Sequence, residues 1–371
     1  MKYYFIYSAG GGAGDWNGVK RVWNEYMPCN LKSNILLKFG DVFLNHARPT
    51  TPCRPRRWNG ISNLRQWLFD ATQDEFVLNT SNVLLDSGSA KLVNFIAHNN
   101  PCIPNDVLIN KFDDIINRYD IIEKYINVIQ DSGVNGAVTF DVPNPFKIRS
   151  QNGNARLNIL SHNDRRRLIE LSANYSNRIF HSMDNNEQRL FTIISGEWSV
   201  PEIQDFLSRL DYNPRNIAIG GLSAADEATF LQGVNNLVQA NLDYDHIHFL
   251  GCGGLKKVTI LHNTAFNNER TSVDCSTPIN RSIDGNVNGT AQSCYYTYQN
   301  HELIRIKPET RNRILALHAD AENPLFDLDQ MTEIIDAVLR HQSNQSSEET
   351  YNGRAKLLIH NSDVYRRFAN E

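Results

Sequence analysis

Short apolar runs, each followed by a polar residue or a glycine, recur along this chain and restrict its fold more than any other feature. Seven such runs begin at Asn34, Asn82, Gly136, Phe191, Asn216, His246 and Thr271. They are rich in Val, Ile, Leu and Phe and are apolar throughout, which is typical of strands buried on both faces, as in a parallel sheet. The runs therefore predict a mostly parallel sheet rather than a half-exposed antiparallel one.

Helical patterns lie between these runs. Residues 112–130 place Ile115, Ile116, Tyr119 and further isoleucines at helical spacing, and residues 201–210 form a shorter amphipathic pattern. Strands alternating with helices predict parallel βα units. Seven recognisable strands, with an eighth that the pattern does not reveal, favour a closed (β/α)₈ TIM barrel, and an open doubly wound sheet is the alternative.

The pattern changes after about residue 300. Residues 327–340 have an apolar helical face that includes Met331, Ile334 and Ile335, the polar residues 342–353 resemble a loop, and residues 356–371 again have a helical pattern. We therefore expect a TIM-barrel catalytic domain with an N-terminal strand extension over residues 1–300. A C-terminal helical subdomain packed on the barrel is expected over residues 301–371.

Composition restricts the partners and the compartment. The 37 Lys and Arg residues are balanced by 41 Asp and Glu residues, so a nucleic-acid contact would have to be a local patch. The six cysteines form no CxxC pair, which indicates free thiols in a reducing compartment, with the cytoplasm as the default. No stretch approaches the roughly 20 apolar residues of a membrane span, and the first apolar run is too short for a convincing signal peptide.

Polar residues at the ends of the apolar runs are the candidates for chemistry, because a TIM barrel forms its active site at the C-terminal ends of its strands. Asp86, Asp141 and Asp274 each end such a run, and Gly220 and Gly221 end another. Three carboxylates at one barrel mouth repel one another, which tends to raise the pKa of at least one of them. Such a group is suited to acid/base work.

Six short segments, in the same order along the chain, resemble the tRNA-guanine transglycosylases. LLDSGS at residues 84–89 resembles their DSGG(F/Y), TFDVP at 139–143 their guanine-reading strand, and IGGLS at 219–223, with Asp226 following, their GGL(A/S)xxE. HFLGCGG at 248–254 resembles their H(Y/F)L(M/L)GVG, VDCSTPINR at 273–281 their FDCVLPTR, and LLIHN at 357–361 their terminal helix. The matches run from Leu84 to Asn361.

The resemblance implies a role for each of the two catalytic carboxylates. Asp274 matches the nucleophile that attacks the sugar C1′ and expels guanine, which leaves a covalent glycosyl-enzyme intermediate. Asp86 matches the general acid/base, which protonates the departing guanine and deprotonates the incoming deazaguanine. This logic parallels that of a retaining glycosidase, and it requires no cofactor.

The resemblance also implies a base pocket. Asp141 matches the carboxylate that accepts hydrogen bonds from the ring N–H and the exocyclic amine of guanine, a pair of donors that adenine lacks. The other base-binding candidates are Ser87, Ser195, Gly196, Gly220, Gly221 and Leu222. Glycines suit this role because the missing Cβ lets the heterocycle approach the backbone.

The chain departs from the tRNA enzymes at several positions. Ala90 replaces their stacking aromatic residue, Ser195 replaces their pocket glutamine, and the PTR after the nucleophile becomes Pro-Ile-Asn-Arg, so that Arg281 is a candidate backbone clamp. Their CxCxxC cluster is absent. His360 matches their zinc histidine, but a tetrahedral site needs about four ligands, so we expect no bound metal and a histidine with a packing or capping role.

These departures make the chain more similar to the phage DNA-guanine transglycosylases, the DpdA group, which insert a 7-deazaguanine such as preQ0 into DNA. We therefore expect DNA and the two bases as partners, in a host cytoplasm if the chain is phage-encoded. The expected nucleic-acid patch is Arg54, Arg56, Arg57 and Trp58, which combine phosphate-pairing guanidinium groups with a stacking surface, and residues 165–167 form a second basic cluster.

Three alternatives remain open at this point. The same exchange could act on tRNA, or the chain could be a non-catalytic, transglycosylase-like binding subunit. A metal-dependent barrel hydrolase would need a histidine-rich mouth, for which only His246 and His248 fit, and both precede the turn. The sequence does not determine the oligomeric state.

Overall fold

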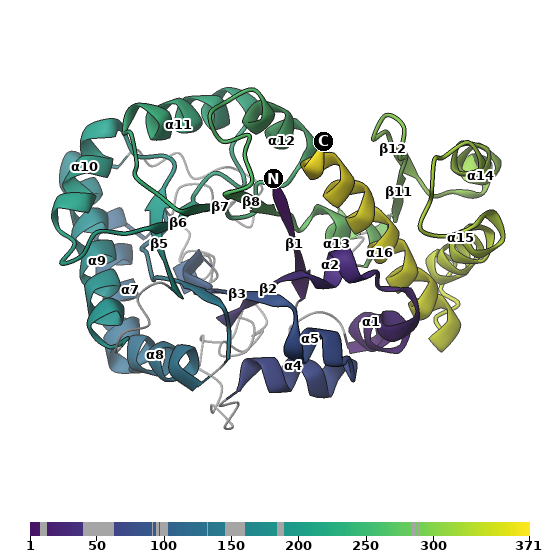
Figure 1. The fold of residues 1–371 in the computed structure, drawn as a ribbon, viewed down its shortest axis with the longest axis horizontal. Helices are drawn as coiled ribbons and strands as arrows, with labels where there is room; N and C mark the ends of the chain where they lie inside the picture. The colour runs from purple at the N-terminus through teal and green to yellow at the C-terminus, as the bar shows by residue number, and fades with distance from the viewer. Residues whose placement is uncertain are drawn as a thin grey trace.

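Eight parallel strands close into a barrel in the computed structural model of this chain (Figure 1). The structure describes residues 1–7, 13–39, 63–90, 92–93, 96, 103–131, 133–144, 160–183, 189–283, 286–287, 290–291 and 293–371. The barrel strands are β1 (Lys2–Tyr7), β2 (Asn34–Lys38), β3 (Asn82–Asp86), β4 (Gly136–Val138), β5 (Leu190–Ser195), β6 (Asn216–Gly220), β7 (His246–Phe249) and β8 (Thr271–Asp274). Each pairs with the next, and β8 returns to β1, where Tyr4 lies opposite Asp274. The TIM-barrel prediction is confirmed.

Helices surround this barrel (Figure 1). They are α1 (Ala13–Tyr26), α2 (Cys29–Lys32), α4 (Leu64–Thr72), α5 (Glu75–Asn79), α7 (Asn105–Arg118), α8 (Ile121–Asp131), α9 (His162–His181), α10 (Val200–Ser208), α11 (Glu227–Gln239), α12 (Leu255–His262) and α13 (Thr277–Ser282). Local capping sets several of their starts: the Ser161 hydroxyl accepts from the backbone N–H of Asp164 at 3.1 Å, and Asp226 accepts from that of Thr229 at 2.8 Å.

The strand that the pattern did not reveal is β1. Tyr3 through Tyr7 are buried, and Phe5 and Tyr7 make edge contacts with the fully buried Trp23 of α1. The opening run is therefore the first barrel strand. The single helix expected over residues 112–130 is wrong: α7 and α8 are separate helices, because Asp120 between them has a φ of 50° that a helix cannot continue through.

The C-terminal region consists of the hairpin of β11 (Cys294–Tyr296) and β12 (Leu303–Arg305), the 3₁₀ turn η3 (Pro308–Thr310), and the helices α14 (Arg311–Ala319), α15 (Leu328–Gln342) and α16 (Glu348–Asn370). A short pair, β9 (Asn286–Val287) and β10 (Thr290–Ala291), precedes the hairpin. The loop expected over residues 342–353 is wrong in its second half, since a capping box between Ser347 and Thr350 starts α16 at Glu348. The expected boundary at residue 300 falls inside the β11–β12 hairpin.

Helix α16 joins this region to the barrel. It lies between the barrel and α15 (Figure 1) and packs against α1, α13 and β1. Its fully buried Asn361 donates its amide to the Ser282 hydroxyl at 2.8 Å and to the Cys294 carbonyl at 2.9 Å, and accepts from the Tyr296 N–H at 3.1 Å. One side chain therefore ties α16 to both α13 and β11.

Replacing Asn361 with Leu is expected to lower the free energy of unfolding by on the order of 3 kcal/mol, because the Tyr296 N–H and the Cys294 carbonyl lose their buried partner. Asn352→Leu on the same helix is the control: Asn352 accepts from Arg21 at an exposed position, so a change within about 0.5 kcal/mol is expected. Urea unfolding of both variants measures the difference. Equal losses would contradict a joining role for Asn361.

Candidate active site at the barrel mouth

A pocket of about 190 Å³ opens at the C-terminal ends of the barrel strands. Asp86 and Asp274 end β3 and β8, Asp141 follows β4 by three residues, and all three line it. The other lining residues are Leu36, Lys38, Ser89, Ala90, Pro143, Ile193, Gly220, Gly221, Ser223, Leu250, Gly251 and Ser276. The structure therefore brings the three predicted carboxylates into one cavity.

Asp274 ends β8, and only 2% of its side chain is exposed. Its Oδ1 accepts the backbone N–H of Gly251 at 2.8 Å and lies 3.1 Å from Nε2 of His248. Gly251 has a φ of 67°, a backbone conformation that favours glycine, and this turn directs its N–H at the carboxylate. Both contacts reach the same oxygen, so the carboxylate is held from one side.

The thiol next to Asp274 does not compete with it as a nucleophile. Cys275 is buried, and this burial raises the pKa of its thiol to about 11. A thiol with that pKa stays protonated at neutral pH and is a weak nucleophile. The four cysteines in the described ranges, Cys29, Cys252, Cys275 and Cys294, are all free, as the sequence predicts.

Asp86 ends β3 and is half-buried. Its Oδ1 accepts the backbone N–H of Gly88 at 3.2 Å, and Gly88 has a φ of 73°. Lys38 ends the neighbouring strand β2 directly opposite Asp86 in the register, and both residues line the pocket. Asp86 is therefore more open to solvent than the other two carboxylates.

Asp141 is also buried, with 5% of the residue exposed. Burial raises the pKa of Asp141 to about 7, and the negative charge of Asp86 contributes to this rise. The hydrogen bond that the Ser89 hydroxyl donates to Oδ1 of Asp141 lowers the pKa and so opposes the rise. Gly220 leaves the space beside it: a Cβ at residue 220 would lie 3.7 Å from Oδ2 of Asp141 and 3.2 Å from Ile193. Near neutral pH, Asp141 can therefore be protonated or ionised according to what binds next to it.

The remaining predicted base-binding residues divide into two groups. Gly220 and Gly221 line the pocket, whereas Ser195, Gly196, Leu222 and Ser87 do not. Gly196 packs tightly against the fully buried Leu222, since a Cβ there would lie 2.3 Å from its side chain. Ser195 lies close to Gly221. Ser195, Gly196 and Leu222 therefore form the packing behind the glycine turn.

Of the predicted nucleic-acid residues, Arg281 alone falls within the described ranges. Arg54, Arg56, Arg57 and Trp58 lie outside the described residues. Arg281 lies on α13 and is half-buried, and it does not line the pocket. In the second basic cluster, Arg165 pairs with Glu202 at 3.5 Å, and it also lines a separate pocket of about 470 Å³ with Asn144 and Gly196.

Sequence reasoning missed Lys38, Ser89 and His248. Ser89 replaces the second glycine of the DSGG segment, and that departure is a signal that the sequence offers. His248 was considered only as a metal ligand, but its side chain is fully buried and contacts Asp274. His246 is exposed at the other end of β7. No cluster of three or more potential metal ligands occurs among the described residues.

His360 does not lie in a set of residues that fits zinc. It is fully buried, its Nε2 lies 2.8 Å from the Tyr296 carbonyl, and its ring stacks on Tyr295 with centroids 4.6 Å apart. Burial lowers its pKa to about 3, so the ring is neutral. Its Nδ1 has no hydrogen-bond partner within the described part of the chain, but no group of three or more possible metal ligands occurs there, and a tetrahedral site needs about four.

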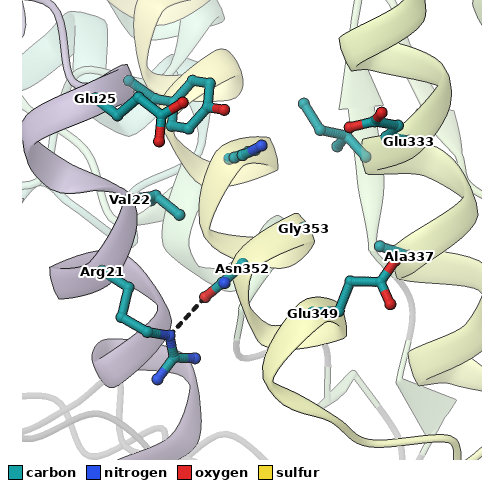
Figure 2. Close-up of a pocket in the computed structure, with 11 residues that line it drawn as sticks. Arg21, Val22, Glu25, Glu333, Ala337, Glu349, Asn352 and Gly353 are labelled. Carbon is teal, nitrogen blue, oxygen red and sulfur yellow. Dashed lines mark hydrogen bonds between the residues drawn. The ribbon is translucent and has the colours of Figure 1, made fainter.

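A second pocket lies outside the barrel, between α1, α15 and α16 (Figure 2). It measures about 220 Å³, and Arg21 donates to Asn352 across its edge at 2.8 Å. Its acidic residues, Glu25, Glu333 and Glu349, are exposed, and none of the predicted site residues lines it. The barrel mouth is therefore the stronger candidate site.

Comparison with models of known protein families gives no match, and no curated protein matches this chain significantly. Across the described ranges, no helix has both the length and the apolar character needed to cross a bilayer. The case for a function consequently rests on the pocket, its three carboxylates and the sequence motifs that supply them.

Proposed function

We propose that this protein is a base-exchange transglycosylase that replaces a guanine in DNA with a 7-deazaguanine, such as a preQ0-like base. The observation that carries the proposal is the meeting of Asp86, Asp141 and Asp274 in one pocket at the barrel mouth. The three carboxylates have different surroundings, which is how one site obtains different roles from the same functional group.

In the first half of the proposed reaction, a carboxylate oxygen of Asp274 attacks C1′ of the sugar. The new bond from C1′ to this oxygen forms as the bond from C1′ to N9 of guanine breaks, and the protonated Asp86 gives its proton to the departing base. The half-buried position of Asp86 suits this proton transfer. The products of this half are a glycosyl ester at Asp274 and free guanine.

In the second half, the 7-deazaguanine occupies the place that guanine has left. Ionised Asp86 accepts the proton from N9 of this base, N9 attacks C1′, and the Asp274 carboxylate departs. Two displacements at C1′ retain the configuration of the sugar, as in retaining glycosidases. Each proton and each bond lost in the first half is regained, so no cofactor takes part.

Asp141 supplies the selectivity for guanine in this proposal. Its ionised carboxylate accepts from the N1–H and the exocyclic amine of the base, and Gly220 leaves room for the ring beside it. The pocket, at about 190 Å³, is smaller than the roughly 300–1,000 Å³ of sites for drug-sized ligands. A single flipped-out base suits this size, and flipping from a duplex costs a few kcal/mol.

The departures from the tRNA enzymes support DNA as the polymer. Ala90 lines the pocket without the aromatic ring of those enzymes, and His360 is packed by Tyr295 rather than surrounded by metal ligands. The zinc-bearing region of the tRNA enzymes is thus replaced here by a packed aromatic cluster. The proposal places the protein in the cytoplasm, with DNA and the two bases as its partners.

The direct test offers the purified protein radiolabelled guanine or labelled preQ0 with genomic DNA in one reaction and bulk tRNA in another. We expect label in the DNA fraction, released only when the DNA is hydrolysed. Label in tRNA alone would overturn the choice of polymer and leave the chemistry standing. Label in neither, together with measurable binding of the base, would instead indicate the non-catalytic binding subunit.

A further inference from the structure

A polar group inside the barrel lies directly behind Asp274. His248 on β7 is fully buried, its Nε2 lies 3.1 Å from Oδ1 of Asp274, and its Nδ1 lies 2.9 Å from the Ser272 hydroxyl. His248 and Ser272 are also partners in the β7–β8 register. Burying an imidazole at this depth is costly unless both ring nitrogens are hydrogen-bonded, and here both have partners.

We propose that His248 is a positioning residue for the nucleophile, which holds Oδ1 of Asp274 together with the Gly251 N–H so that Oδ2 is the oxygen that attacks. The inference rests on the proposed base exchange. Both observed contacts reach Oδ1, at 2.8 Å and 3.1 Å, and no hydrogen bond to Oδ2 is seen from the described residues. Oδ2 therefore keeps its lone pairs for the sugar carbon.

Two donors on one carboxylate oxygen also serve the second half of the reaction. In the glycosyl ester, Oδ1 is the carbonyl oxygen and Oδ2 is bound to C1′. When the incoming base attacks C1′, negative charge returns to the carboxylate, and donors already aimed at Oδ1 stabilise it without reorganising. The same pair thus orients the attack and stabilises the leaving group.

Asp274 determines which ring nitrogen of His248 carries the proton, and the Ser272 hydroxyl pairs with the other nitrogen. An ionised carboxylate only accepts, so the bond to Asp274 requires a hydrogen on Nε2, and Nδ1 of a neutral ring then accepts from the Ser272 hydroxyl. The Ile247 carbonyl, at 3.4 Å, is a second and more distant acceptor for the same hydroxyl. The ring of Tyr4 on β1 covers His248 edge-on at 5.1 Å, and Ala218 is its small register partner on β6. His248 therefore has little freedom to rotate.

The test compares His248→Gln with His248→Met. The two replacements have nearly the same shape, but only glutamine retains an N–H that can reach Oδ1. We expect His248→Met to lower kcat for labelled-base exchange by about 10²–10³-fold, with KM for the base unchanged, and His248→Gln to recover kcat to within about tenfold of wild type. Equal losses in two folded variants, or a change confined to KM, would overturn the proposal.

A second measurement does not depend on catalysis. Long-range ¹H–¹⁵N spectra of protein labelled at its 11 histidines report the tautomer of each ring, and the difference spectrum against His248→Gln assigns His248. We expect the Nε2–H form, and a shift of its Nδ1 signal in Ser272→Ala, whether or not the wild type exchanges guanine. An Nδ1–H tautomer would overturn the positioning role. Absence of exchange in the wild type, with the expected tautomer present, would overturn only the proposed function.

Should His248→Met fail to fold, Ser272→Ala supplies the kinetic test. It leaves the imidazole in place but removes the hydroxyl that pairs with its Nδ1. We expect a several-fold lower kcat with unchanged KM, because the ring then lacks the Nδ1 partner that helps to hold its Nε2 at Asp274. Unchanged kcat in this variant, together with an unchanged His248 spectrum, would count against the proposal.

Discussion

An Asp274→Asn variant is expected to lose guanine exchange by at least about 10⁴-fold, the scale of effect seen when a covalent nucleophile is removed. The amide keeps the size of the carboxylate, and its oxygen can still accept from the Gly251 N–H, so the fold should be preserved. What is lost is the charged oxygen that attacks C1′. Labelled-guanine incorporation measures the loss, and a denaturing gel shows whether the protein–nucleic acid adduct disappears with it.

The matched control makes the same change away from the site. Asp70 lies exposed on α4, where it accepts from Gln66 at 2.9 Å, and Asp70→Asn should leave exchange within about twofold of wild type. The loss of exchange in Asp86→Asn should lie between those of the other two variants, at about 10²–10⁴-fold, because this change removes proton transfer but keeps the nucleophile. Exchange that survives in Asp274→Asn would exclude a glycosyl ester at this residue.

An Asp141→Asn variant is expected to be more stable than the wild type at pH 8 while losing affinity for guanine. Burial raises the pKa of Asp141 to about 7 from an ordinary value of 3.8. The folded protein therefore holds this proton more tightly than the unfolded chain. The stability that this bound proton contributes is fully present below pH 3.8 and is lost as the pH rises through 7. Each unit of pKa difference corresponds to about 1.4 kcal/mol, so the total loss is on the order of a few kcal/mol.

Asparagine carries no charge to bury, so the gain from Asp141→Asn should be large at pH 8 and near zero at pH 4. Urea unfolding at the two pH values measures it, with Asp70→Asn as the control for a charge change alone. The same substitution replaces one acceptor oxygen with an amine that faces the donors of guanine, so binding should fail. A gain of equal size at both pH values would show that the effect does not come from this ionisation.

Guanine binding by the wild type should follow the same ionisation. Because the proposed contact needs the charged carboxylate, affinity should weaken by up to about tenfold for each pH unit below 7. Isothermal titration of guanine between pH 5.5 and 7.5 checks this. Ser89→Ala should move the profile to higher pH, since the Ser89 hydroxyl donates to Asp141 and lowers its pKa.

The sequence predicted the barrel because each strand leaves its own local signal. A strand buried on both faces is apolar along its whole length, as at Asn216–Gly220, and it needs no knowledge of its neighbours to be recognised. The first strand, Lys2–Tyr7, has the same character but was weighed only as a leader segment. The break between α7 and α8 was missed because the isoleucine spacing continues across Asp120.

The meeting of the three carboxylates in one pocket could be predicted as far as it depends on strand ends. Asp86 and Asp274 terminate β3 and β8, so their position follows from where an apolar run stops. The contact between His248 and Asp274 does not follow in this way, because it depends on which residues of two parallel strands lie opposite each other. The sequence predicted that at least one of the carboxylates has a raised pKa because of repulsion between them. The pKa of Asp141 is raised, but the largest cause is burial.

The packing of α16 on β1 and α1 also sets an order of events during synthesis. A ribosome adds about 5–20 residues per second, so the first strand waits roughly 20–70 s before its covering helix emerges. Throughout that interval the apolar residues of α1 and β1 lack a partner that the finished barrel provides. We therefore expect the nascent chain to bind chaperones early, and the seam between β8 and β1 to close only after translation has passed α16.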